Sequence, residues 1–372
     1  MNRKETKIRL LLTGGGTGGH LFPAVATAQK FKEQMPDTEV LFVGTKRRVD
    51  TKSLGAYGFA SESVLCYGLK GKNPLELLKA LAVLPLSCLQ ALLVIRRFKP
   101  DIIFGVGGYV TGPVVAAGKI LRIPVVIHEQ NSVPGLANRK LGRFADRVCL
   151  SLPGSGTKFP AEKILYTGNP VRSKILELAG KTQSRKSGRR TLLILGGSQG
   201  AQAVNGMVIE ALCSLTDEQL QEIRVIHQTG ARDEDQVRNA YQKRGVDAEV
   251  AGFFTQMHEV YEQADLLVSR AGATTLSEIA VLGKPAILIP YPYAADNHQE
   301  KNGQYYVSGG GAVQFIQKDL TAKHLGETIL GLINNDEKLD IMGEAMKRLA
   351  FPDAAERIMA CCLEEIEKRH AQ

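Results

Sequence analysis

Short apolar runs alternate with longer amphipathic stretches along the whole chain. The runs are rich in Val, Ile and Leu, and they cover residues 8–12, 40–43, 102–104, 125–128, 148–150, 192–195, 223–227, 249–252, 266–269, 286–289 and 313–316. Runs of this kind are typical of parallel strands that are covered on both faces, and the stretches between them are typical of helices. The pattern predicts an α/β protein built from doubly wound, Rossmann-like domains.

The two halves of the chain begin alike. Residues 8–12 lead into the glycine-rich stretch 14–20, and residues 192–195 lead into a second one at 196–200. A chain of 372 residues is also longer than one ordinary domain. We therefore expect two domains, residues 1–168 and 169–349, with the amphipathic segment 350–372 packing back on the first.

Both glycine-rich stretches lie between a predicted strand and a predicted helix. Glycine lets backbone N–H groups approach a ligand, and the N-terminus of the following helix favours an anion. The first stretch also matches the dinucleotide fingerprint, but the next strand ends at Lys46 without the acidic residue that would bind a ribose. An NADP-dependent oxidoreductase therefore remains an alternative only because Lys46 could bind the 2′-phosphate of NADP. The presence of two such loops, one in each domain, indicates binding sites for a phosphorylated ligand rather than tight turns that bind no ligand.

His20 ends the first glycine-rich stretch. Histidine has an ordinary pKa near 6.5 and can take a proton from a hydroxyl group as a general base. We predict that His20 is a catalytic base, with Glu129 as the second candidate. The alternative is a structural role, in which His20 hydrogen-bonds the loop or positions a sugar.

Residues 270–278 follow another apolar run and contain Thr274, Thr275, Ser277 and Glu278. The hydroxyl side chains are predicted to cap a helix, which would place Glu278 in its first turn. Two interpretations of Glu278 stay open at this point. It either complements the helix dipole, or it binds two vicinal hydroxyls such as those of a ribose.

The acidic stretch 233–235 has the Asp-x-Asp form with which some sugar transferases hold a metal ion. It precedes a predicted helix, so a solvated first helical turn is the favoured interpretation. We expect no metal ion and no cofactor.

The amino-acid composition indicates which classes of binding partner to expect. The formal net charge of +9 indicates an anionic partner, whereas 6% aromatic residues and the absence of Trp disfavour nucleic acid. The six cysteines form no Cys-x-x-Cys pair, which favours a reduced, cytoplasmic chain.

Residues 75–95 are strongly apolar and lie between basic clusters. Their uncharged part, 80–95, is shorter than the roughly 18–20 residues that a membrane span needs, and Pro85 interrupts it. A buried helix and an in-plane contact with anionic lipid both stay open.

Several motifs, in this order, identify a family: residues 14–20 with 22–23, 107–113, 128–131, 168–172, 196–201 and 270–278. By these motifs the chain resembles the MurG family over essentially its whole length. The resemblance implies the two-domain GT-B glycosyltransferase fold. It also implies inverting transfer of N-acetylglucosamine from UDP-N-acetylglucosamine to lipid I (undecaprenyl-pyrophosphoryl-MurNAc-pentapeptide), which gives lipid II in peptidoglycan synthesis.

Two alternatives remain beside this resemblance. A related transferase with a diacylglycerol acceptor is disfavoured by the match at residues 128–131. A nucleotide-sugar-binding protein without catalysis is disfavoured by the presence of His20.

The resemblance also implies which residues form the site. A phosphate loop at 198–200, a uracil-contacting backbone at Phe254 and a ribose carboxylate at Glu278 belong to the donor site. The donor contacts as a whole are Thr17, Gly18, Gly19, Asn131, Arg172, Ser198, Gln199, Gly200, Phe254, Ala273, Thr274, Thr275, Leu276, Ser277, Glu278 and Gln299. A membrane patch is formed by Leu75, Leu78, Lys79, Leu81, Leu84, Arg96 and Arg97. The enzyme is then expected as a peripheral protein on the cytoplasmic face of the cell membrane, with other cell-wall synthesis proteins as possible partners.

Overall fold

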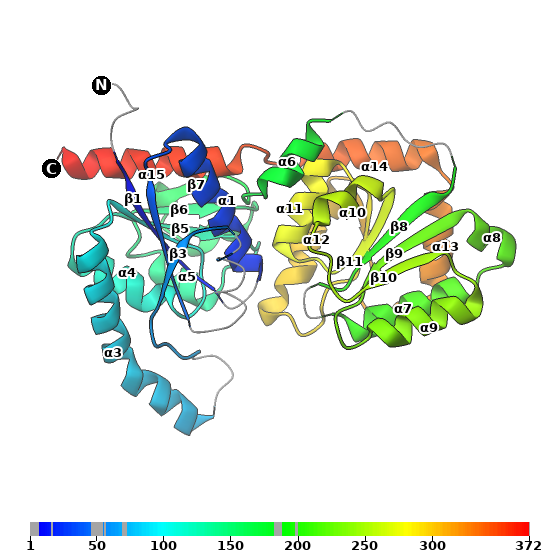
Figure 1. Ribbon diagram of the computed structural model, residues 1–372, viewed down its shortest axis with the longest axis horizontal. Helices are drawn as coiled ribbons and strands as arrows, with labels where there is room; N and C mark the ends of the chain where they lie inside the picture. The colour runs from blue at the N-terminus through cyan, green and yellow to red at the C-terminus, as the bar shows by residue number, and fades with distance from the viewer. Residues whose placement is uncertain are drawn as a thin grey trace. The chain divides into compact units, whose positions relative to one another are not determined.

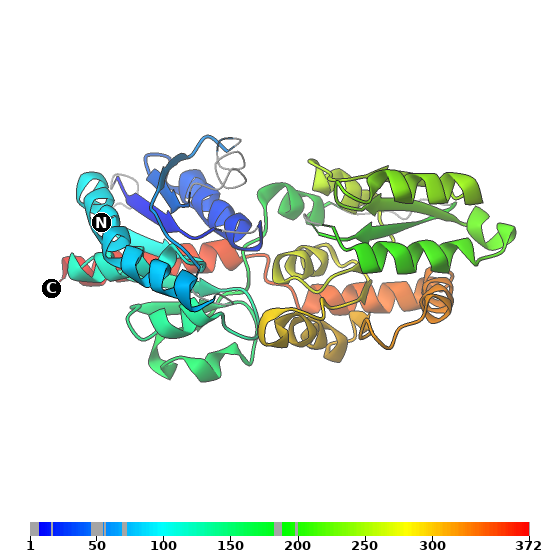
Figure 2. The same cartoon turned by 90° about the horizontal axis from the view of Figure 1, so that it is seen from below.

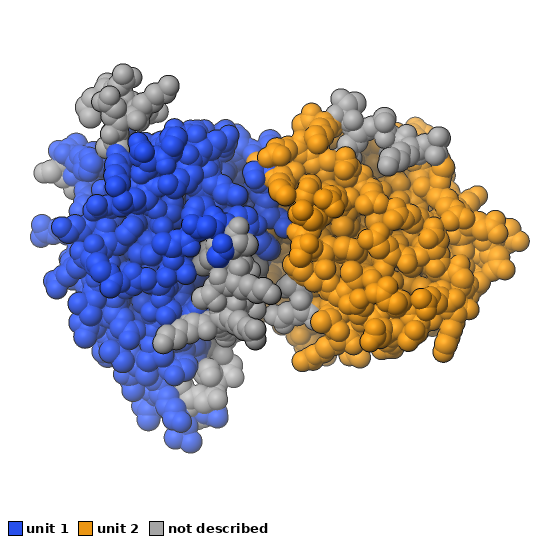
Figure 3. All heavy atoms as spheres, viewed as in Figure 1, with its two compact units in different colours: residues 1–173, 351–372 blue, residues 174–350 orange. Residues whose placement is uncertain are grey.

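The computed structural model describes residues 7–15, 18–45, 55, 57–68, 73–181, 188–197 and 200–371. The chain divides into two compact units, residues 1–173 with 351–372 and residues 174–350 (Figure 3). The division falls after Ser173 rather than after Gly168. Each unit contains one parallel sheet, which confirms the α/β prediction.

The described part of unit 1 forms a seven-stranded sheet in the order β3-β2-β1-β4-β5-β6-β7. Its elements are β1 (Arg9–Thr13), α1 (Gly18–Gln34), β2 (Glu39–Gly44), β3 (Ala60–Ser63), α3 (Pro74–Phe98), β4 (Ile102–Gly105), α4 (Thr111–Ile120), β5 (Val125–Glu129), α5 (Leu136–Leu141), β6 (Arg147–Leu150), η1 (Ser155–Lys158), η2 (Ala161–Lys163), β7 (Ile164–Tyr166) and α15 (Ala354–His370). The strand order reverses at β1, which pairs with β2 on one side and β4 on the other. Doubly wound sheets bind their ligands at such a point, beside the carboxyl ends of the strands.

The two faces of this sheet are covered by different helices (Figures 1 and 2). Leu10 and Leu12 belong to the core that contains residues of α1 and α15, whereas Leu11 belongs to the core under α3 and α4. This alternation follows from the period of two along a strand. The last helix, α15, is thus an integral part of unit 1: Ile358 and Ile366 are buried there.

The described part of unit 2 forms a six-stranded sheet in the order β10-β9-β8-β11-β12-β13. Its elements are α6 (Ser173–Ala179), which begins at the boundary, β8 (Arg190–Leu195), α7 (Gln202–Cys213), α8 (Asp217–Gln221), β9 (Ile223–Gln228), α9 (Glu234–Arg244), β10 (Ala248–Ala251), α10 (Met257–Gln263), β11 (Leu266–Ser269), α11 (Ala273–Leu282), β12 (Ala286–Leu288), η3 (Ala295–Asn297), α12 (His298–Ser308), β13 (Ala312–Gln314), α13 (Ala322–Ile333) and α14 (Asp336–Arg348). Here the order reverses at β8. In both units, therefore, the glycine-rich stretch follows the strand at which the sheet reverses.

Candidate functional site

In unit 1 the loops after β1 and β4 pack against each other through glycine. A Cβ atom on Gly108, which has φ +92°, would lie 2.7 Å from the carbonyl oxygen of Gly15. A Cβ atom on Gly14 would lie 2.3 Å from the Val106 side chain. Both distances are far shorter than real contacts, so the two backbones approach this closely only because these residues are glycines.

His20 lies in the first turn of α1, directly after this loop. Its Cε1 atom would be 3.4 Å from a Cβ on Gly107, so the ring lies against the β4 loop. Its Nδ1 atom is buried and makes no hydrogen bond to the part of the chain described. The structure thus places an imidazole beside the loops that follow β1 and β4.

Glu129, the second candidate base, is 1% exposed at the end of β5. Its Oε1 accepts hydrogen bonds from the backbone and side-chain nitrogens of Asn131 at 3.0 and 3.2 Å. Its Oε2 accepts from the Gly135 backbone at 3.0 Å and from Asn138 Nδ2 at 2.9 Å. Four donors occupy this carboxylate, a geometry that favours a role in holding the loop that carries Asn131 over a role in proton transfer.

His128, the preceding residue, is fully buried on the other face of β5. Its Nε2 donates to the Gly168 carbonyl at 3.1 Å and also lies 3.0 Å from Ser151 Oγ, and its Nδ1 accepts from Gln130 Nε2 at 3.3 Å. Burial lowers the pKa of His128 to about 4. The imidazole is therefore neutral and structural at neutral pH.

Arg172 belongs to unit 1 in the structure. Its guanidinium carbon lies 4.8 Å from the centre of the Phe22 ring, a cation–π contact with a residue of α1. The contact holds the Arg172 cation near the same helix start that carries His20.

In unit 2 the loops after β8 and β9 pack together in the same way. The Gly196 N–H donates to the Gln228 carbonyl at 3.1 Å, and a Cβ on Gly200, with φ +79°, would lie 2.6 Å from the Thr229 carbonyl. The predicted phosphate-loop residues Ser198 and Gln199 lie outside the described residues, as does Thr17 of the first loop.

A buried polar network lies beneath this loop. Asn205 Nδ2 donates to the Thr229 carbonyl at 2.9 Å and to Asp233 Oδ2 at 2.8 Å. Asn205 Oδ1 must then accept from His227 Nε2, at 3.1 Å, and His227 Nδ1 accepts from the Tyr241 hydroxyl at 2.9 Å. Burial lowers the pKa of His227 to about 3, so this chain of bonds is made by a neutral imidazole.

The acidic stretch 233–235 has a structural role in this arrangement. Asp233 precedes α9 and binds Asn205, and Glu234 Oε2 accepts from the Gly252 backbone at 2.8 Å. The stretch therefore begins a helix, as predicted, but two of its carboxylates face the protein rather than solvent. Within the described ranges no group of three or more His, Cys, Asp or Glu side chains could hold a metal ion.

Residues 270–278 differ from the sequence prediction in their helix start. The α11 helix begins at Ala273 after an extended Gly272, and no side chain caps it. Thr274 and Thr275 thus lie inside the first turn, and Glu278 lies one turn further along. The predicted capping role and the first-turn position of Glu278 were wrong, because glycine starts this helix with backbone geometry alone.

The side chains of α11 have different surroundings. Glu278 is 3% exposed, and its Oε2 accepts from the Tyr261 hydroxyl at 3.0 Å. Leu276 and Ala273 are buried in the core, so they can offer a ligand only their backbone. Ser277 Oγ donates back to the Ala273 carbonyl at 2.9 Å.

Two further predicted donor contacts are held by side-chain to backbone bonds. Gln299 Oε1 accepts from the Tyr291 N–H at 2.9 Å, and the Phe254 N–H donates to Gln228 Oε1 at 3.1 Å. Both bonds lie at loops that follow the carboxyl ends of strands in unit 2.

The α3 helix has two apolar faces. One packs on α4 and its core through Ala91 and Ile95, and Ala80 on the same face is also buried. The opposite face carries exposed leucines at helical spacing: Leu75, Leu78, Leu86, Leu89 and Leu93. We call these five residues the leucine stripe.

The sequence prediction included Leu75 and Leu78 and missed the other three members of the leucine stripe. Leu84 is also exposed, as are Lys79 and Arg96, whereas Arg97 forms an ion pair with Glu62. The side chain of Leu81 lies outside what is described. Figure 1 shows the amino-terminal part of α3 projecting beyond the sheet.

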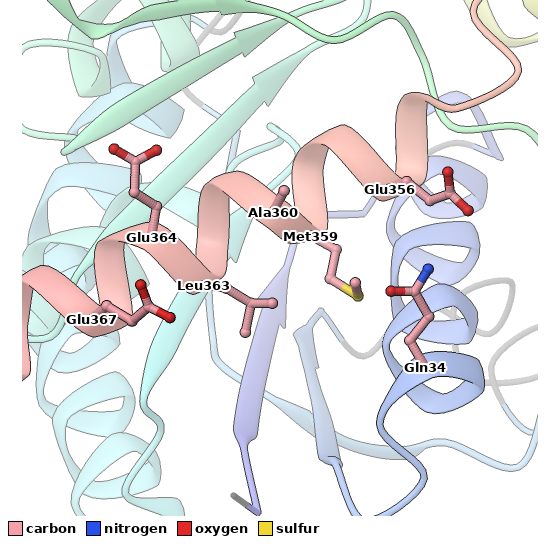
Figure 4. Close-up of a pocket in the computed structure, with 7 residues that line it drawn as sticks. All are labelled: Gln34, Glu356, Met359, Ala360, Leu363, Glu364 and Glu367. Carbon is pink, nitrogen blue, oxygen red and sulfur yellow. The ribbon is translucent and has the colours of Figure 1, made fainter. Parts of the chain in front are cut away.

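A groove of about 430 Å³ lies elsewhere on unit 1, between α15 and the end of α1 (Figure 4). It is lined by Gln34, Glu356, Met359, Ala360, Leu363, Glu364 and Glu367. Since α1 runs back from the carboxyl edge of the sheet, the groove lies at the opposite edge from His20 and is separate from the candidate site.

The chain has close relatives with a shared name. The glycosyltransferase family 28 N-terminal domain matches residues 10–150, and the C-terminal domain of the same family matches residues 191–358. A UDP-N-acetylglucosamine--N-acetylmuramyl-(pentapeptide) pyrophosphoryl-undecaprenol N-acetylglucosamine transferase of Desulfotalea psychrophila is 56% identical, over 98% of this chain and 99% of its own length. A protein of the same name from Geobacter sulfurreducens is 41% identical, over 95% and 97%.

Solved structures agree with these relatives. The crystal structure of Acinetobacter baumannii MurG matches 96% of this chain and 100% of its own, with 28% identity and a TM-score of 0.76. This match confirms the predicted GT-B fold. The UDP-GlcNAc 2-epimerase of Neisseria meningitidis, bound to UDP-GlcNAc, has a TM-score of 0.66 at 14% identity, over 96% and 100%, and shares the fold alone.

Proposed function

The chain belongs to the MurG family of family 28 glycosyltransferases, and on this basis we propose that it transfers N-acetylglucosamine from UDP-N-acetylglucosamine to lipid I. The product is lipid II, the disaccharide precursor of peptidoglycan. The observation that carries this function is the 56% identity over 98% of the chain to a transferase so named. Incubation with labelled UDP-N-acetylglucosamine and a lipid I analogue tests it, and absence of labelled disaccharide would reject it.

The donor nucleotide is bound by unit 2. The phosphates lie at the loop after β8, where the N-terminus of α7 favours negative charge without a cation. Glu278 binds the ribose hydroxyls, and the backbone at Phe254 contacts the uracil. The other donor residues of unit 2 are Ser198, Gln199, Gly200, Thr274, Thr275 and Gln299, with backbone contributions from Ala273, Leu276 and Ser277. Residues 17–19, Asn131 and Arg172 of unit 1 complete the set.

His20 acts as the base in the transfer step. The imidazole takes the proton of the acceptor hydroxyl, and the hydroxyl oxygen forms a bond to the anomeric carbon of the donor sugar. The bond from that carbon to the UDP oxygen breaks on the opposite side, which inverts the configuration. The growing negative charge on UDP is stabilised by backbone N–H groups at helix N-termini.

The acceptor contains undecaprenol, a lipid, so the enzyme acts at a membrane. The leucine stripe and the neighbouring basic residues are the contact surface, on the cytoplasmic face. By length and composition alone, Leu78–Phe98 among the described residues could also cross a membrane. Against crossing, the Leu65 N–H donates to Gln90 Oε1 at 2.8 Å and Ser87 Oγ donates to the Leu65 carbonyl, bonds that tie α3 to unit 1. Peripheral binding keeps this packing intact.

Replacing Leu75, Leu78 and Leu89 with Ser is expected to release the protein from phosphatidylglycerol- or cardiolipin-rich vesicles. Each buried leucine contributes roughly 1.5–3 kcal/mol when it leaves water, so the vesicle-bound fraction should fall at least about tenfold in a sedimentation assay. Activity on a short-chain, water-soluble acceptor should survive.

The matched control is Ile341→Ser, because Ile341 is a similarly exposed apolar residue on α14 of unit 2. This variant should bind vesicles like the wild type. Unchanged vesicle binding by the triple variant would show that the stripe is not the contact surface.

The free energy of unfolding should decrease as the pH is lowered, because each unit contains a buried histidine that is neutral in the folded state. The pKa of His128 is lowered to about 4 and that of His227 to about 3, so below about pH 6.5 the unfolded chain takes up protons that the folded chain does not. The free energy of unfolding therefore decreases as the pH falls from about 7 towards 4, by on the order of 3 kcal/mol for His128. His227→Gln should make this decrease smaller for unit 2, whereas the exposed His324→Gln should leave it unchanged. Urea unfolding followed by circular dichroism at several pH values measures the free energy of unfolding of the wild type and of both variants. If this free energy changes equally with pH in all three proteins, His227 is not the source of the pH dependence.

A further inference from the structure

Asn138 of α5 carries a buried amide whose orientation is fixed by two acceptors. The residue is 2% exposed, and its Nδ2 donates to Glu129 Oε2 at 2.9 Å and to the His128 carbonyl at 3.0 Å. Because both partners can only accept, the two hydrogens of the amide must face them, and the assignment of nitrogen and oxygen is settled. The remaining atom, Oδ1, is therefore a hydrogen-bond acceptor held in a fixed place.

This oxygen lies beside the ring of His20. A Cβ atom on Gly107, which has φ +93°, would be 3.5 Å from Asn138 Oδ1 and 3.4 Å from His20 Cε1. Both groups thus border the Cα atom of Gly107, which carries no side chain. His20 Nδ1, which is bonded to Cε1, and Asn138 Oδ1 are both buried and make no hydrogen bond to the described residues.

A third buried polar atom lies at the same loop. Gln130 Nε2 donates to the carbonyl of Val106, the residue before Gly107, at 3.0 Å, and its Oε1 is an acceptor without a hydrogen bond among the residues described. Buried polar atoms are costly unless they are paired, and one water molecule can pair several of them. With two acceptors to satisfy, a water uses both of its hydrogens on them and accepts from Nδ1–H.

We propose that Asn138 is a positioning residue that holds His20 as the Nδ1–H tautomer through one bridging water. This inference rests on the proposed function, in which His20 is the base. Since Nδ1 is buried, the acceptor hydroxyl can reach only Nε2, and Nε2 has a free lone pair only when the hydrogen is on Nδ1. After Nε2 takes the proton, the Glu129 carboxylate behind Asn138 polarises the amide towards the imidazolium.

The tautomer of His20 is measured by nitrogen NMR on the full-length protein labelled with ¹⁵N-histidine, at a pH well above the ordinary pKa of histidine. The His20 signals are assigned by their loss in His20→Asn. The wild type should carry its hydrogen on Nδ1, and Asn138→Ala should shift His20 towards the Nε2–H form that free histidine prefers. The wild-type measurement needs no variant, and an Nε2–H ring there would overturn the positioning role.

Asn138→Asp tests the same contact with the shape of the side chain conserved. It keeps an oxygen in place of Oδ1, and its second oxygen can share a proton with Glu129 Oε2, as adjacent carboxyl groups do. His20 should therefore stay in the Nδ1–H form in this variant. Loss of that form in Asn138→Asp, or its persistence in Asn138→Ala, would contradict the proposal.

Kinetics separate positioning of His20 from support of the loop. Asn138→Ala should lower kcat by roughly 10–100-fold, with the KM for UDP-N-acetylglucosamine within about twofold of wild type. In a His20→Ala background the same substitution should change the residual kcat by less than about twofold, because the two residues act as one unit. A further loss as large as that in the wild-type background would mean that Asn138 only supports the loop.

The control is Asn335→Ala, which removes the N-cap of α14 in unit 2 and so lowers stability away from His20. The tautomer and kcat should be those of the wild type. A wild type that transfers no sugar, but in which Asn138 sets the His20 tautomer, would reject the proposed function and support the contact. An active wild type in which the tautomer does not depend on Asn138 would overturn this inference alone.

Discussion

Replacing His20 with Ala or Asn should lower kcat by roughly 10²–10⁴-fold, the usual contribution of a general base. The substitution removes a reactive group without breaking a hydrogen bond from its Nδ1 atom to the described part of the chain. UDP affinity should change by less than about twofold, because His20 is not one of the proposed donor contacts.

The pH dependence separates a base from a merely positioning residue. A base must be unprotonated to work, so the wild-type rate should fall on the acidic side of the profile. That acidic limb should be missing from the residual activity of the His20 variants. The control is His370→Ala, an exposed residue at the end of α15, which should retain the wild-type profile. Near-normal kcat, or persistence of the limb, would remove His20 from this role.

The second large effect is expected at Glu278. Glu278→Ala should raise the KM for UDP-N-acetylglucosamine by about tenfold or more, since one or two hydrogen bonds to a carboxylate contribute roughly 1.5–3 kcal/mol each. The interpretation as a partner of the helix dipole is weakened by the structure, because that effect fades beyond the first turn and Glu278 lies in the second.

Two comparisons isolate the ribose contact from a loss of packing. Tyr261→Phe removes the hydroxyl that binds Glu278 but keeps the carboxylate, so its KM should rise much less. Removing the ribose 2′-hydroxyl, as in dUDP, should weaken binding to the wild type but not to Glu278→Ala. If calorimetry gives the same UDP affinity for Glu278→Ala and wild type, Glu278 does not bind the ribose.

Eleven of the thirteen described strands were readable from the sequence, whereas β3 and β7, the edge strands of unit 1, were not. All eleven apolar runs correspond to strands. Nine of them lie inside a sheet, where a parallel strand covered on both faces must be apolar throughout, and the other two, β10 and β13, are the edge strands of unit 2. The two remaining strands, β3 and β7, lie at the ends of the unit 1 sheet, and β3 reads Ala-Ser-Glu-Ser. An edge strand that faces solvent has no need of an apolar run, so its pattern does not differ from that of a loop.

The sequence could not predict the role of a site residue where the hydrogen-bond partners of its side chain decide that role. Glu129 and His20 are both titratable residues in characteristic motifs, and only the four donors around Glu129 distinguish a loop-holding carboxylate from a reactive one. For α3, the sequence shows an apolar helix but not which of its faces is covered by α4.

The position of α15 has a consequence for biosynthesis. Its residues Ile358, Cys362 and Ile366 complete a core that begins with Ile8, yet they leave the ribosome only after the whole of residues 174–350. Throughout translation of residues 174–350, the amino-terminal sheet therefore has one apolar face without its final cover. Unit 2 can fold meanwhile from contiguous sequence, whereas unit 1 depends on contacts between the two ends of the chain. Nascent chains that stall before α15 should consequently be clients of holding chaperones, and a truncation at residue 350 removes part of the amino-terminal core rather than a dispensable tail.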